Sequence, residues 1–435
     1  MFDKDIIRLL IQYSQKTASL YRADRIALVL GVCMILSSTV FQKLALPGSG
    51  GNLPISVLLV PLIILVGLAT SVLQISRETY IPFALLLVIG LCNFAASKGP
   101  FISLPSLALF ATVQGTLIFR FSSAVSVALP LHHFFRNTIL VLAVLGVIQF
   151  GLQFIAGPSV AFFLDFHLPV GVIARNYNVL NPLYWNSPIF KSNGFFLLEP
   201  SFFSQLVAIG IALEIVIWRD PRRLLVLTLA TLLSFSGTGL TMLALFLPLY
   251  AISKRQYGIL LVACALAAIV FLAAEPLGLT ALTSRVSEFG SQSSSGWARF
   301  VSPLVYLQDV AFQGPWAFLL GEGPGSIEGI KSLPYFSADP TWAKLIYEYG
   351  FVGLMVYGSL FYSAFVRSRM PLRFPLGYTY VMLGGYLLNP SIVAQLAILV
   401  VWTERDQISG LANGIRGPAL PLPAMETVRR HPLPD

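Results

Sequence analysis

Charged residues are scarce in this chain of 435 residues, since Asp, Glu, Lys and Arg together make up only 11% of it. An average soluble domain contains about 25% of these four residue types. Residues of the set AVILMFWYC account for 56%, so a water-soluble fold of this size would lack the charges that its surface needs. The composition therefore excludes an ordinary soluble protein and indicates a chain that is solvated by lipid.

Cysteine and histidine are also rare, with three and four copies respectively. Each cysteine lies inside an apolar run, which excludes both a disulfide framework and a cysteine-rich zinc cluster. His167 is the one histidine expected on the outer face of the membrane, and no group of acidic residues has the spacing of a cation site. We therefore expect neither a metal nor an organic cofactor.

Long apolar runs are abundant, and they predict an all-α polytopic membrane protein with about 12 transmembrane helices, each of about 20 residues. The runs lie near 26–46, 53–75, 80–97, 101–119, 135–157, 195–218, 222–236, 239–253, 256–277, 341–366, 373–388 and 390–404. The seventh and eighth are short and joined only by Ser236-Gly237-Thr238-Gly239, which predicts a tight hairpin or a re-entrant pair. The stretch 120–134 has basic ends and is expected to lie at the membrane interface.

The net charge of +9 would suit a nucleic-acid-binding protein, but the order of Lys and Arg along the chain points to topology. If the N-terminus is cytoplasmic, 20 of the 28 basic residues fall on the cytoplasmic side. This positive-inside pattern predicts that both termini are cytoplasmic, and it removes the reason to expect a nucleic-acid partner. The expected parts are a cytoplasmic leader 1–25, an integral membrane domain 26–404 and a Pro-rich tail 405–435, whose composition predicts disorder.

Two long segments, about 158–194 and 278–340, become large extracytoplasmic loops in this topology. Six of the eight remaining basic residues lie in or beside them. Long loops are translocated largely regardless of charge, so this excess has a neutral explanation. The alternative is an anion site that faces outward.

The first loop combines Arg175 and Asn176 with Trp185, and the second carries Arg285, Trp297, Arg299 and, at its end, Trp342. Arginine presents a rigid fork of donors that matches phosphate oxygens, so Arg285 and Arg299 suit the two sides of a diphosphate. Amides and aromatic rings suit sugars, although Asn also builds turns and Trp also lines membrane interfaces. Trp185, Trp297, Trp342 and Asn176 are the candidate glycan contacts.

Candidate general bases are Glu199 and Asp339, each followed by a proline at the outer start of a predicted span. An acidic residue before proline is also an ordinary helix start, with Asp339 as its N-cap. Gly321 to Gly325 lacks the Lys and Ser/Thr of a phosphate-binding P-loop and is interpreted as a flexible turn. Glu348 lies one turn after Lys344, a spacing that allows a structural ion pair.

Several of these segments together resemble the O-antigen polymerase/ligase superfamily, in particular the Wzy-type bacterial polysaccharide polymerases. They are Gly194-Phe-Phe-Leu-Leu-Glu199-Pro200-Ser201, Leu233-Ser-Phe-Ser236-Gly237-Thr238-Gly239, the stretch from Arg285 to Arg299, Gly321-Glu-Gly-Pro-Gly325, and Asp339-Pro-Thr-Trp-Ala-Lys344 with the following Glu348-Tyr-Gly350. The resemblance covers about residues 190–365, and the remainder agrees only in topology.

The resemblance implies a GT-C-like glycosyltransferase of the bacterial inner membrane. Such an enzyme transfers a growing glycan from undecaprenyl diphosphate to the next lipid-linked repeat unit on the periplasmic face, without a metal. It further implies diphosphate contacts from Arg175, Arg285 and Arg299, and a base at Asp339 or, as second choice, Glu199. The ligase branch has a His-Asn pair where this chain has Asp339-Pro340, a departure that favours a polymerase.

Two other functions remain open at the level of sequence. A ligase would use the same arginines and differ only in its acceptor, while the number of spans and the short helices at 222–253 are compatible with a transporter or flippase. The expected partners of the polymerase are membrane lipid, the undecaprenyl-diphosphate-linked oligosaccharide, and a chain-length co-polymerase and flippase.

Overall fold

The computed structural model describes residues 22–96, 99, 101–123, 125–169, 171–174, 177–184, 186–272, 290, 292, 294–308, 314–332, 339–367 and 373–403. These residues are mostly helical, with one small sheet in which β1 (Leu73–Ile75) pairs antiparallel with β2 (Phe119–Phe121). The predicted tail 405–435 and most of the leader 1–25 lie outside the described residues.

Five helices are long and apolar enough to cross a membrane. They are α3 (Arg77–Ala96), α5 (Ala128–Ile155), α8 with its π-helical end η2 (Pro200–Trp218), α10 (Gly237–Lys254) and α16 with η6 (Thr341–Val366). Shorter apolar helices are α2 (Ser56–Ala69), α4 with η1 (Leu104–Ile118), α11 (Tyr257–Leu272) and α18 with η7 (Pro390–Val401). The architecture is that of a helical membrane protein, while the count of twelve spans and the GT-C-like fold stay predictions.

The remaining helices connect or cover these spans. Residues 22–38 are helical, and the other elements are α6 (Pro158–Ala161), α7 (Phe163–His167), α9 (Pro221–Leu233), α13 (Ser295–Phe300), α14 (Ser302–Tyr306), α15 (Pro315–Leu320), η5 (Ser326–Ser332) and α17 (Arg373–Met382). The second half of the stretch 120–134 is the first part of α5, which begins at Ala128. Leu131 in this part and Phe135 just beyond it are fully buried, and the interfacial location of the stretch stays a prediction.

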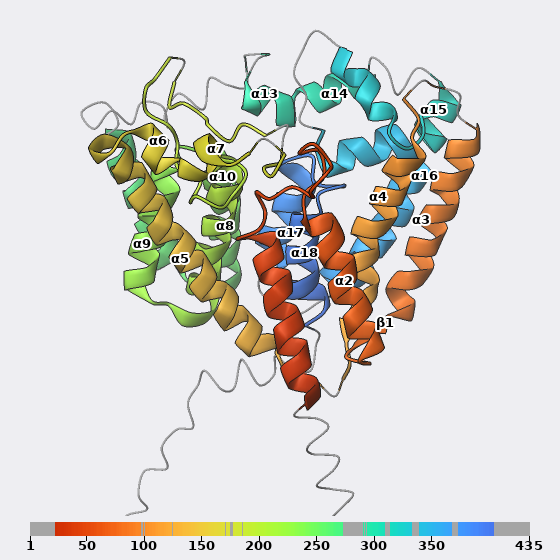
Figure 1. Ribbon diagram of the computed structural model, residues 1–435, viewed down its shortest axis with the longest axis horizontal. Helices are drawn as coiled ribbons and strands as arrows, with labels where there is room; N and C mark the ends of the chain where they lie inside the picture. The colour runs from red at the N-terminus through yellow and green to blue at the C-terminus, as the bar shows by residue number, and fades with distance from the viewer. Residues whose placement is uncertain are drawn as a thin grey trace, which may run out of the picture.

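Two groups of helices flank a central pair, α17 and α18 (Figure 1). On one side α5, α8, α9 and α10 pack together, and on the other α3, α4 and α16 do so, while α17 contacts both α8 and α16. The helices α6, α7, α13, α14 and α15 all lie at one end, which we call the loop end; β1 and β2 lie at the other, the strand end (Figure 1).

α8 and α18 form the core of the bundle. Every residue of both helices is buried, in keeping with a helix that is apolar on all sides. Beyond α18 the side chain of Trp402 is fully buried, and its Nε1 donates to the carbonyl of Thr116 at 2.9 Å. Both helices are therefore held by protein rather than by lipid.

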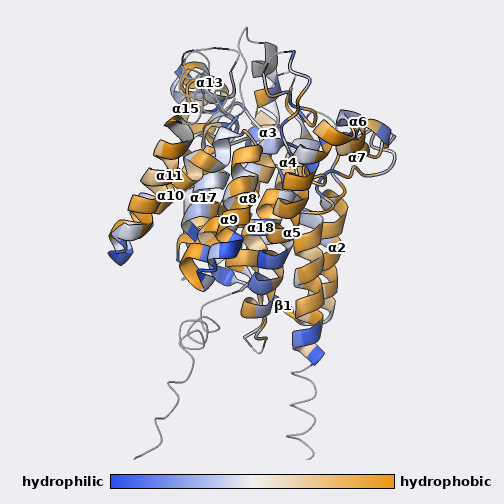
Figure 2. Ribbon diagram, turned by 90° about the vertical axis from the view of Figure 1, so that its left-hand side faces the viewer, coloured by the Kyte–Doolittle hydropathy of each residue, from blue (hydrophilic) through white to orange (hydrophobic). Residues whose placement is uncertain are grey.

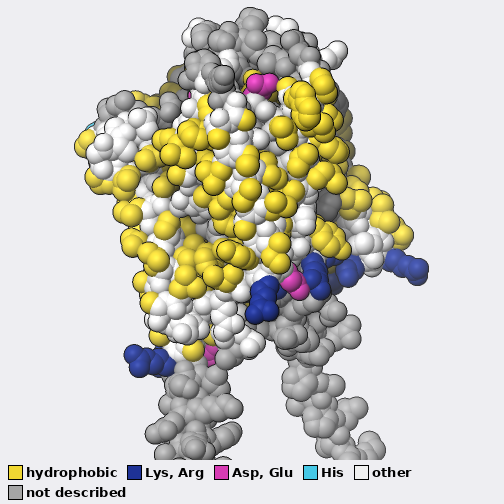
Figure 3. Space-filling view, turned by 90° about the vertical axis from the view of Figure 1, so that its right-hand side faces the viewer, with side chains coloured by type: hydrophobic (Ala, Val, Ile, Leu, Met, Phe, Trp, Pro, Cys, Tyr) yellow, Lys and Arg dark blue, Asp and Glu magenta, His cyan; other side chains and the backbone are white. Residues whose placement is uncertain are grey.

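The outer faces of the other helices carry large apolar side chains, such as Leu62, Leu85 and Ile148, each about half exposed. Figure 2 shows this apolar surface along the helices, and Figure 3 shows Lys and Arg gathered below it, toward the strand end. An apolar belt with a basic rim is typical of a membrane protein. The rim agrees with the predicted positive-inside topology, although the orientation itself stays a prediction.

A buried ion pair fastens α5 to the end of α8 near the strand end. The Arg136 guanidinium donates to both carboxylate oxygens of Glu214, one of them at 2.9 Å, and its carbon lies 4.6 Å from the ring centre of Trp218. Only 10% of the Arg136 side chain and 1% of the Glu214 side chain are exposed. The two-pronged geometry satisfies both charges, and without Arg136 the Glu214 carboxylate would be buried without a cation bound to it.

Replacement of Arg136 by Met should therefore destabilise the protein by about 3–5 kcal/mol, the usual cost of removing one partner from a buried pair. The apparent melting temperature in detergent, followed by size-exclusion chromatography, measures the loss. Arg222→Met is the matched control, because Arg222 is exposed near the same end. Equal melting temperatures of the two variants would contradict the prediction.

Candidate functional site

A polar network fixes the segment that leads into α8 at the loop end. Gln149 Oε1, on α5, accepts hydrogen bonds from the backbone N–H groups of Asn193 and Gly194, both at 3.0 Å, and from Ser192 Oγ at 2.9 Å. Gly194 and Phe195 both have positive φ, at 66° and 64°. This sharp reversal turns the chain toward Glu199, and glycine provides the left-handed conformation at its first position.

A second buried ion pair holds the same segment from the other side. Lys43 Nζ donates to Asp165 Oδ1 at 2.7 Å and to the carbonyl oxygen of Phe195 at 2.6 Å. The two side chains are 2% and 3% exposed and lie in loop-end segments outside the spanning helices. Burial lowers the pKa of Lys43, and the charge of Asp165 opposes that change. The bridge joins the end of the first helix, α7 and the approach to Glu199.

Glu199 stands directly before α8, with Pro200 at the first helical position. Its carboxylate accepts from the backbone N–H of Asn178 and from Ser201 Oγ, both at 2.9 Å, and it makes no helix-capping bond. Burial raises the pKa of Tyr177 to about 12, and the Glu199 charge adds to this rise. Glu199 therefore does not act as an ordinary helix cap, and its charge reaches a neighbouring phenol.

The turn Ser236-Gly237-Thr238-Gly239 packs against the first turns of α8. The N–H of Gly239 donates to Ser204 Oγ at 2.9 Å, and a Cβ on Gly239 would lie 2.4 Å from the Ser204 backbone oxygen. Of the two sequence alternatives, the structure has a tight hairpin, in which α9 ends at Leu233 and α10 begins at Gly237. The N-terminal ends of α8 and α10, with their partial positive charges, thus lie side by side.

Arg299 lies at the start of α10 although it comes from α13. Its NH1 donates to Thr238 Oγ1 at 3.2 Å, while its Nε is buried without a hydrogen-bond partner among the described residues. A buried guanidinium nitrogen beside a helix N-terminus is suited to an anion. Arg299 therefore combines a fixed position with a donor that is left for a ligand.

Tyr386 connects Glu199 with Arg299. It lies in the segment between α17 and α18, its hydroxyl accepts from Gln205 Nε2, and the charges of both Glu199 and Arg299 act on it. Its ring also packs against Phe202, with ring centres 5.5 Å apart. We call Glu199, Tyr177, Tyr386, Gln205 and Arg299 the Glu199 cluster. It combines a carboxylate that can accept a proton with a cation that can stabilise an anionic leaving group.

Sequence reasoning pointed to Glu199 and Arg299 but missed Tyr177, Gln205 and Tyr386. Gln205 lies inside an apolar run, where a buried amide is costly and hence informative. Tyr386 precedes Asn389-Pro390, a helix start whose Asn389 side chain caps α18. These local signals existed, but none of them indicated which segments would meet.

Asp339 does not belong to the Glu199 cluster and stands directly before Pro340, at the start of α16. The prediction that it caps this helix is wrong, because Pro340 occupies the N-cap position and Asp339 has a φ of 46°. The next residue, Thr341, donates through Oγ1 to the carbonyl of Tyr380 on α17 at 2.8 Å. α17 lies between α16 and α8 (Figure 1) and so separates the starts of these two helices.

The glycine-rich segment Gly321 to Gly325 covers a break in α16. At Gly350 the helix has a φ of 68°, and the N–H groups of Glu322 and Gly323 donate to the carbonyls of Tyr347 and Glu348 at 2.8 and 3.0 Å. A Cβ on Gly321 would lie 2.5 Å from the Gly350 nitrogen. This segment therefore packs on the break through backbone hydrogen bonds, and its flexibility stays a prediction.

Four of the predicted contacts, Arg175, Asn176, Trp185 and Arg285, lie outside the described residues. Trp297 is on α13, two residues before Arg299, and Trp342 packs against the small buried cluster around Ile327 and Tyr347. Among the described residues no three His, Cys, Asp or Glu side chains are grouped as metal ligands. The absence of a metal from the reaction stays a prediction.

Replacement of Lys43 by Met should loosen the segment before Glu199, because it leaves the Asp165 carboxylate buried without its cation. Hydrogen exchange of residues 192–199 should become faster by about tenfold or more, which corresponds to at least 1.4 kcal/mol of local stability. Adding Asp165→Leu should restore much of the protection, since removal of both charges is nearly neutral. Lys254→Met, at an exposed site, is the control. Unchanged exchange in Lys43→Met would show that the bridge does not hold this segment.

Comparisons with known proteins place the chain in a family. Neither a search of curated proteins nor a search of solved structures finds a match. The model of one protein family, described as WcaD colanic acid polymerase, matches residues 30–329, which is more than half of the chain and includes Glu199, Tyr177 and Arg299. The chain belongs to the WcaD colanic acid polymerase family, the membrane-bound polymerases of an exopolysaccharide.

Proposed function

We propose that this protein polymerises a colanic-acid-like exopolysaccharide by transferring the growing glycan from undecaprenyl diphosphate to the next lipid-linked repeat unit. The observation that carries the proposal is the Glu199 cluster, in which Glu199 at the start of α8 and Arg299 at the start of α10 stand at two adjoining helix N-termini. Family membership supports the polymerase reaction. The donor, the acceptor and the residue roles are our inference from the site.

The reaction needs one base and one stabilised leaving group. An acceptor sugar hydroxyl attacks the anomeric carbon of the donor, its proton passes to the Glu199 carboxylate, and the bond from that carbon to the diphosphate oxygen breaks. Arg299 and the N-terminal end of α10 stabilise the negative charge that develops on the departing diphosphate. The free lipid diphosphate leaves, and the glycan is longer by one repeat.

Glu199 can act as the base because its hydrogen bonds leave acceptor capacity. Among the described residues each carboxylate oxygen accepts one hydrogen bond, whereas an ionised carboxylate has about four lone-pair sites. Asp339, the first choice from sequence, stands before α16, which packs on α17 away from α8. We therefore assign the base to Glu199 and keep Asp339 as the competing assignment that the experiment must test.

The other predicted contacts fit the same scheme. Arg175 and Arg285 are proposed to hold diphosphate together with Arg299, and Asn176, Trp185, Trp297 and Trp342 to contact the glycan. The reaction is proposed to take place at the loop end, on the periplasmic face of the inner membrane, with both termini in the cytoplasm. A flippase that delivers the repeat units and a co-polymerase that sets chain length are the proposed partners.

Glu199→Gln should lower the polymerisation rate by about 10²–10⁴-fold, because it removes the proton acceptor and keeps the shape of the side chain. Polymer formed from lipid-linked repeats by the purified full-length protein, resolved on gels, gives the rate. Glu78→Gln, at a half-exposed glutamate near the strand end, is the control. A loss in Asp339→Asn with normal activity in Glu199→Gln would move the base to Asp339.

Loss of the gene should leave single lipid-linked repeat units, whereas loss of a ligase would leave long lipid-linked chains. Complementation with the double variant Arg285→Ala and Arg299→Ala should fail, since removing even one transition-state donor typically costs about 10²–10³-fold. Complementation with Arg222→Ala should succeed. Normal polymer in cells without the gene would contradict the enzyme assignment and favour transport.

A further inference from the structure

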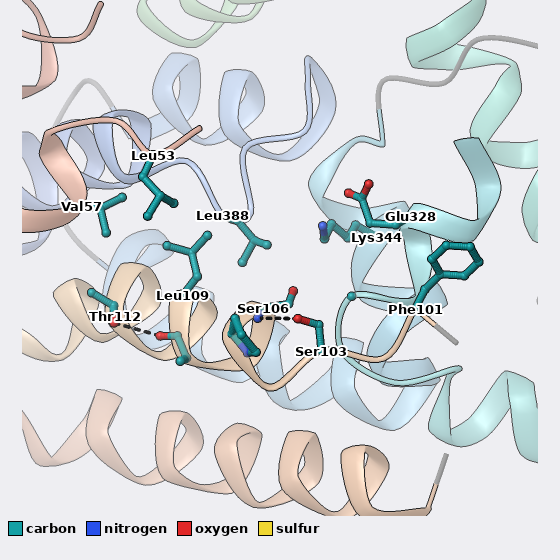
Figure 4. Close-up of a pocket in the computed structure, with 13 residues that line it drawn as sticks. Leu53, Val57, Phe101, Ser103, Ser106, Leu109, Thr112, Glu328, Lys344 and Leu388 are labelled. Atoms are coloured by element: carbon teal, nitrogen blue, oxygen red, sulfur yellow. Dashed lines mark hydrogen bonds between the residues drawn. The ribbon is translucent and has the colours of Figure 1, made fainter. Parts of the chain in front are cut away.

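A cavity of about 500 Å³ lies at the loop end between α2, α4 and α16. Figure 4 shows that its lining divides into two parts. One part is formed by the side chains of Leu53, Val57 and Leu109, with Leu388 beside them, and the other by Ser103, Phe101, Glu328 and Lys344. The volume is that of a typical small-molecule site, and the lining suits a molecule with an apolar and a polar end.

The polar part contains one cation that is largely shielded from solvent. The Lys344 side chain is 13% exposed, and its Nζ lies 3.5 Å from Glu348 Oε1, which confirms the ion pair expected from sequence. The exposed Glu328 carboxylate and the ring of Phe101 line the cavity beside it. An ammonium group suits a phosphate, while a carboxylate and an aromatic ring suit the hydroxyls and the apolar face of a sugar.

The cavity adjoins the Glu199 cluster through one short segment. Leu388 lines the cavity, and Tyr386, two residues earlier, belongs to the cluster. This segment is held in place, because Gln114 Nε2, on α4, donates to the carbonyl of Leu387 at 2.6 Å. A molecule in the cavity and a molecule at Arg299 would therefore lie on either side of the same segment.

We infer that this cavity binds the acceptor, with the first isoprene units of its lipid against Leu53, Val57 and Leu109 and its phosphate beside Lys344. This inference rests on the proposed function, since a polymerase must hold two lipid-linked molecules at once. Arg299 belongs to the donor, because the leaving diphosphate needs a cation and Arg299 lies at the start of α10, beside the start of α8 where Glu199 stands. The acceptor lipid then takes the cavity, and its first sugar lies near Lys344, between Leu388 on one side and Glu328 and Phe101 on the other.

A cavity-filling substitution tests the assignment. Leu109→Trp should raise the KM for the acceptor by about tenfold or more with little change in kcat, because the indole takes the space of buried isoprene carbons. Leu62→Trp is the matched control, since Leu62 is 47% exposed on α2 and does not line the cavity. Val57→Phe fills the same space from the opposite wall and replaces Leu109→Trp if that variant does not fold.

The identity of the occupant is tested separately by photo-crosslinking. A polyprenyl diphosphate sugar with a photoreactive group in its first isoprene unit should label α2 or α4 of the full-length protein, and Leu109→Trp should reduce this labelling. Two results would overturn the inference while the wild type still polymerises. One is a KM for the cavity variants equal to that of Leu62→Trp, and the other is labelling of the cavity by a photoreactive phospholipid alone. Failure of the wild type to polymerise would instead overturn the proposed function.

Discussion

Helices that begin or break inside an apolar bundle leave backbone groups that water cannot reach, and the protein must supply their hydrogen-bond partners. Three such interruptions among the described residues are satisfied by another element. Ser204 accepts from the N–H of Gly239 at the start of α10, Gln114 donates to the carbonyl of Leu387 before α18, and Gly323 donates to the carbonyl of Glu348 where α16 breaks. Polar side chains are therefore concentrated where helices are interrupted, in a protein with few polar residues to place.

The Glu199 cluster is a product of the same constraint. α8 and α10 both begin at the loop end, so their N-terminal partial charges face the same region. The segment between α17 and α18 brings Tyr386 to this region, and α13 brings Arg299. Glu199 and Arg299, the proposed base and the proposed cation for the leaving group, are thus carried by different elements, and hydrogen bonds hold each of them in place. Leu388, two residues after Tyr386, lines the cavity proposed for the acceptor, so one short piece of chain connects the two proposed sites.

Much of the fold follows from local patterns in the sequence. The apolar runs located α10 and α16 closely, because hydrophobic length and proline or serine caps act within a few residues. Glu199 and Arg299 were predicted because a carboxylate and an arginine in the outer loops suit a base and a diphosphate contact. Tyr386 could not be assigned, since its role depends on α8 and α13, which are distant in the chain. Asp339 was misjudged as a helix cap because a cap depends on backbone angles that composition does not determine.

The bridge between Lys43 and Asp165 has a consequence for how the protein is made. Its two residues are 122 positions apart in the chain. At a synthesis rate of about 5–20 residues per second, Lys43 exists for roughly 6 to 24 s before the ribosome adds Asp165. During that time the Lys43 ammonium group lacks the Asp165 carboxylate, and the segment that leads to Glu199 has not yet been synthesised. The first helix must therefore be inserted before the partner of Lys43 exists. The bridge beside Glu199 can form only after more than a third of the chain has been synthesised.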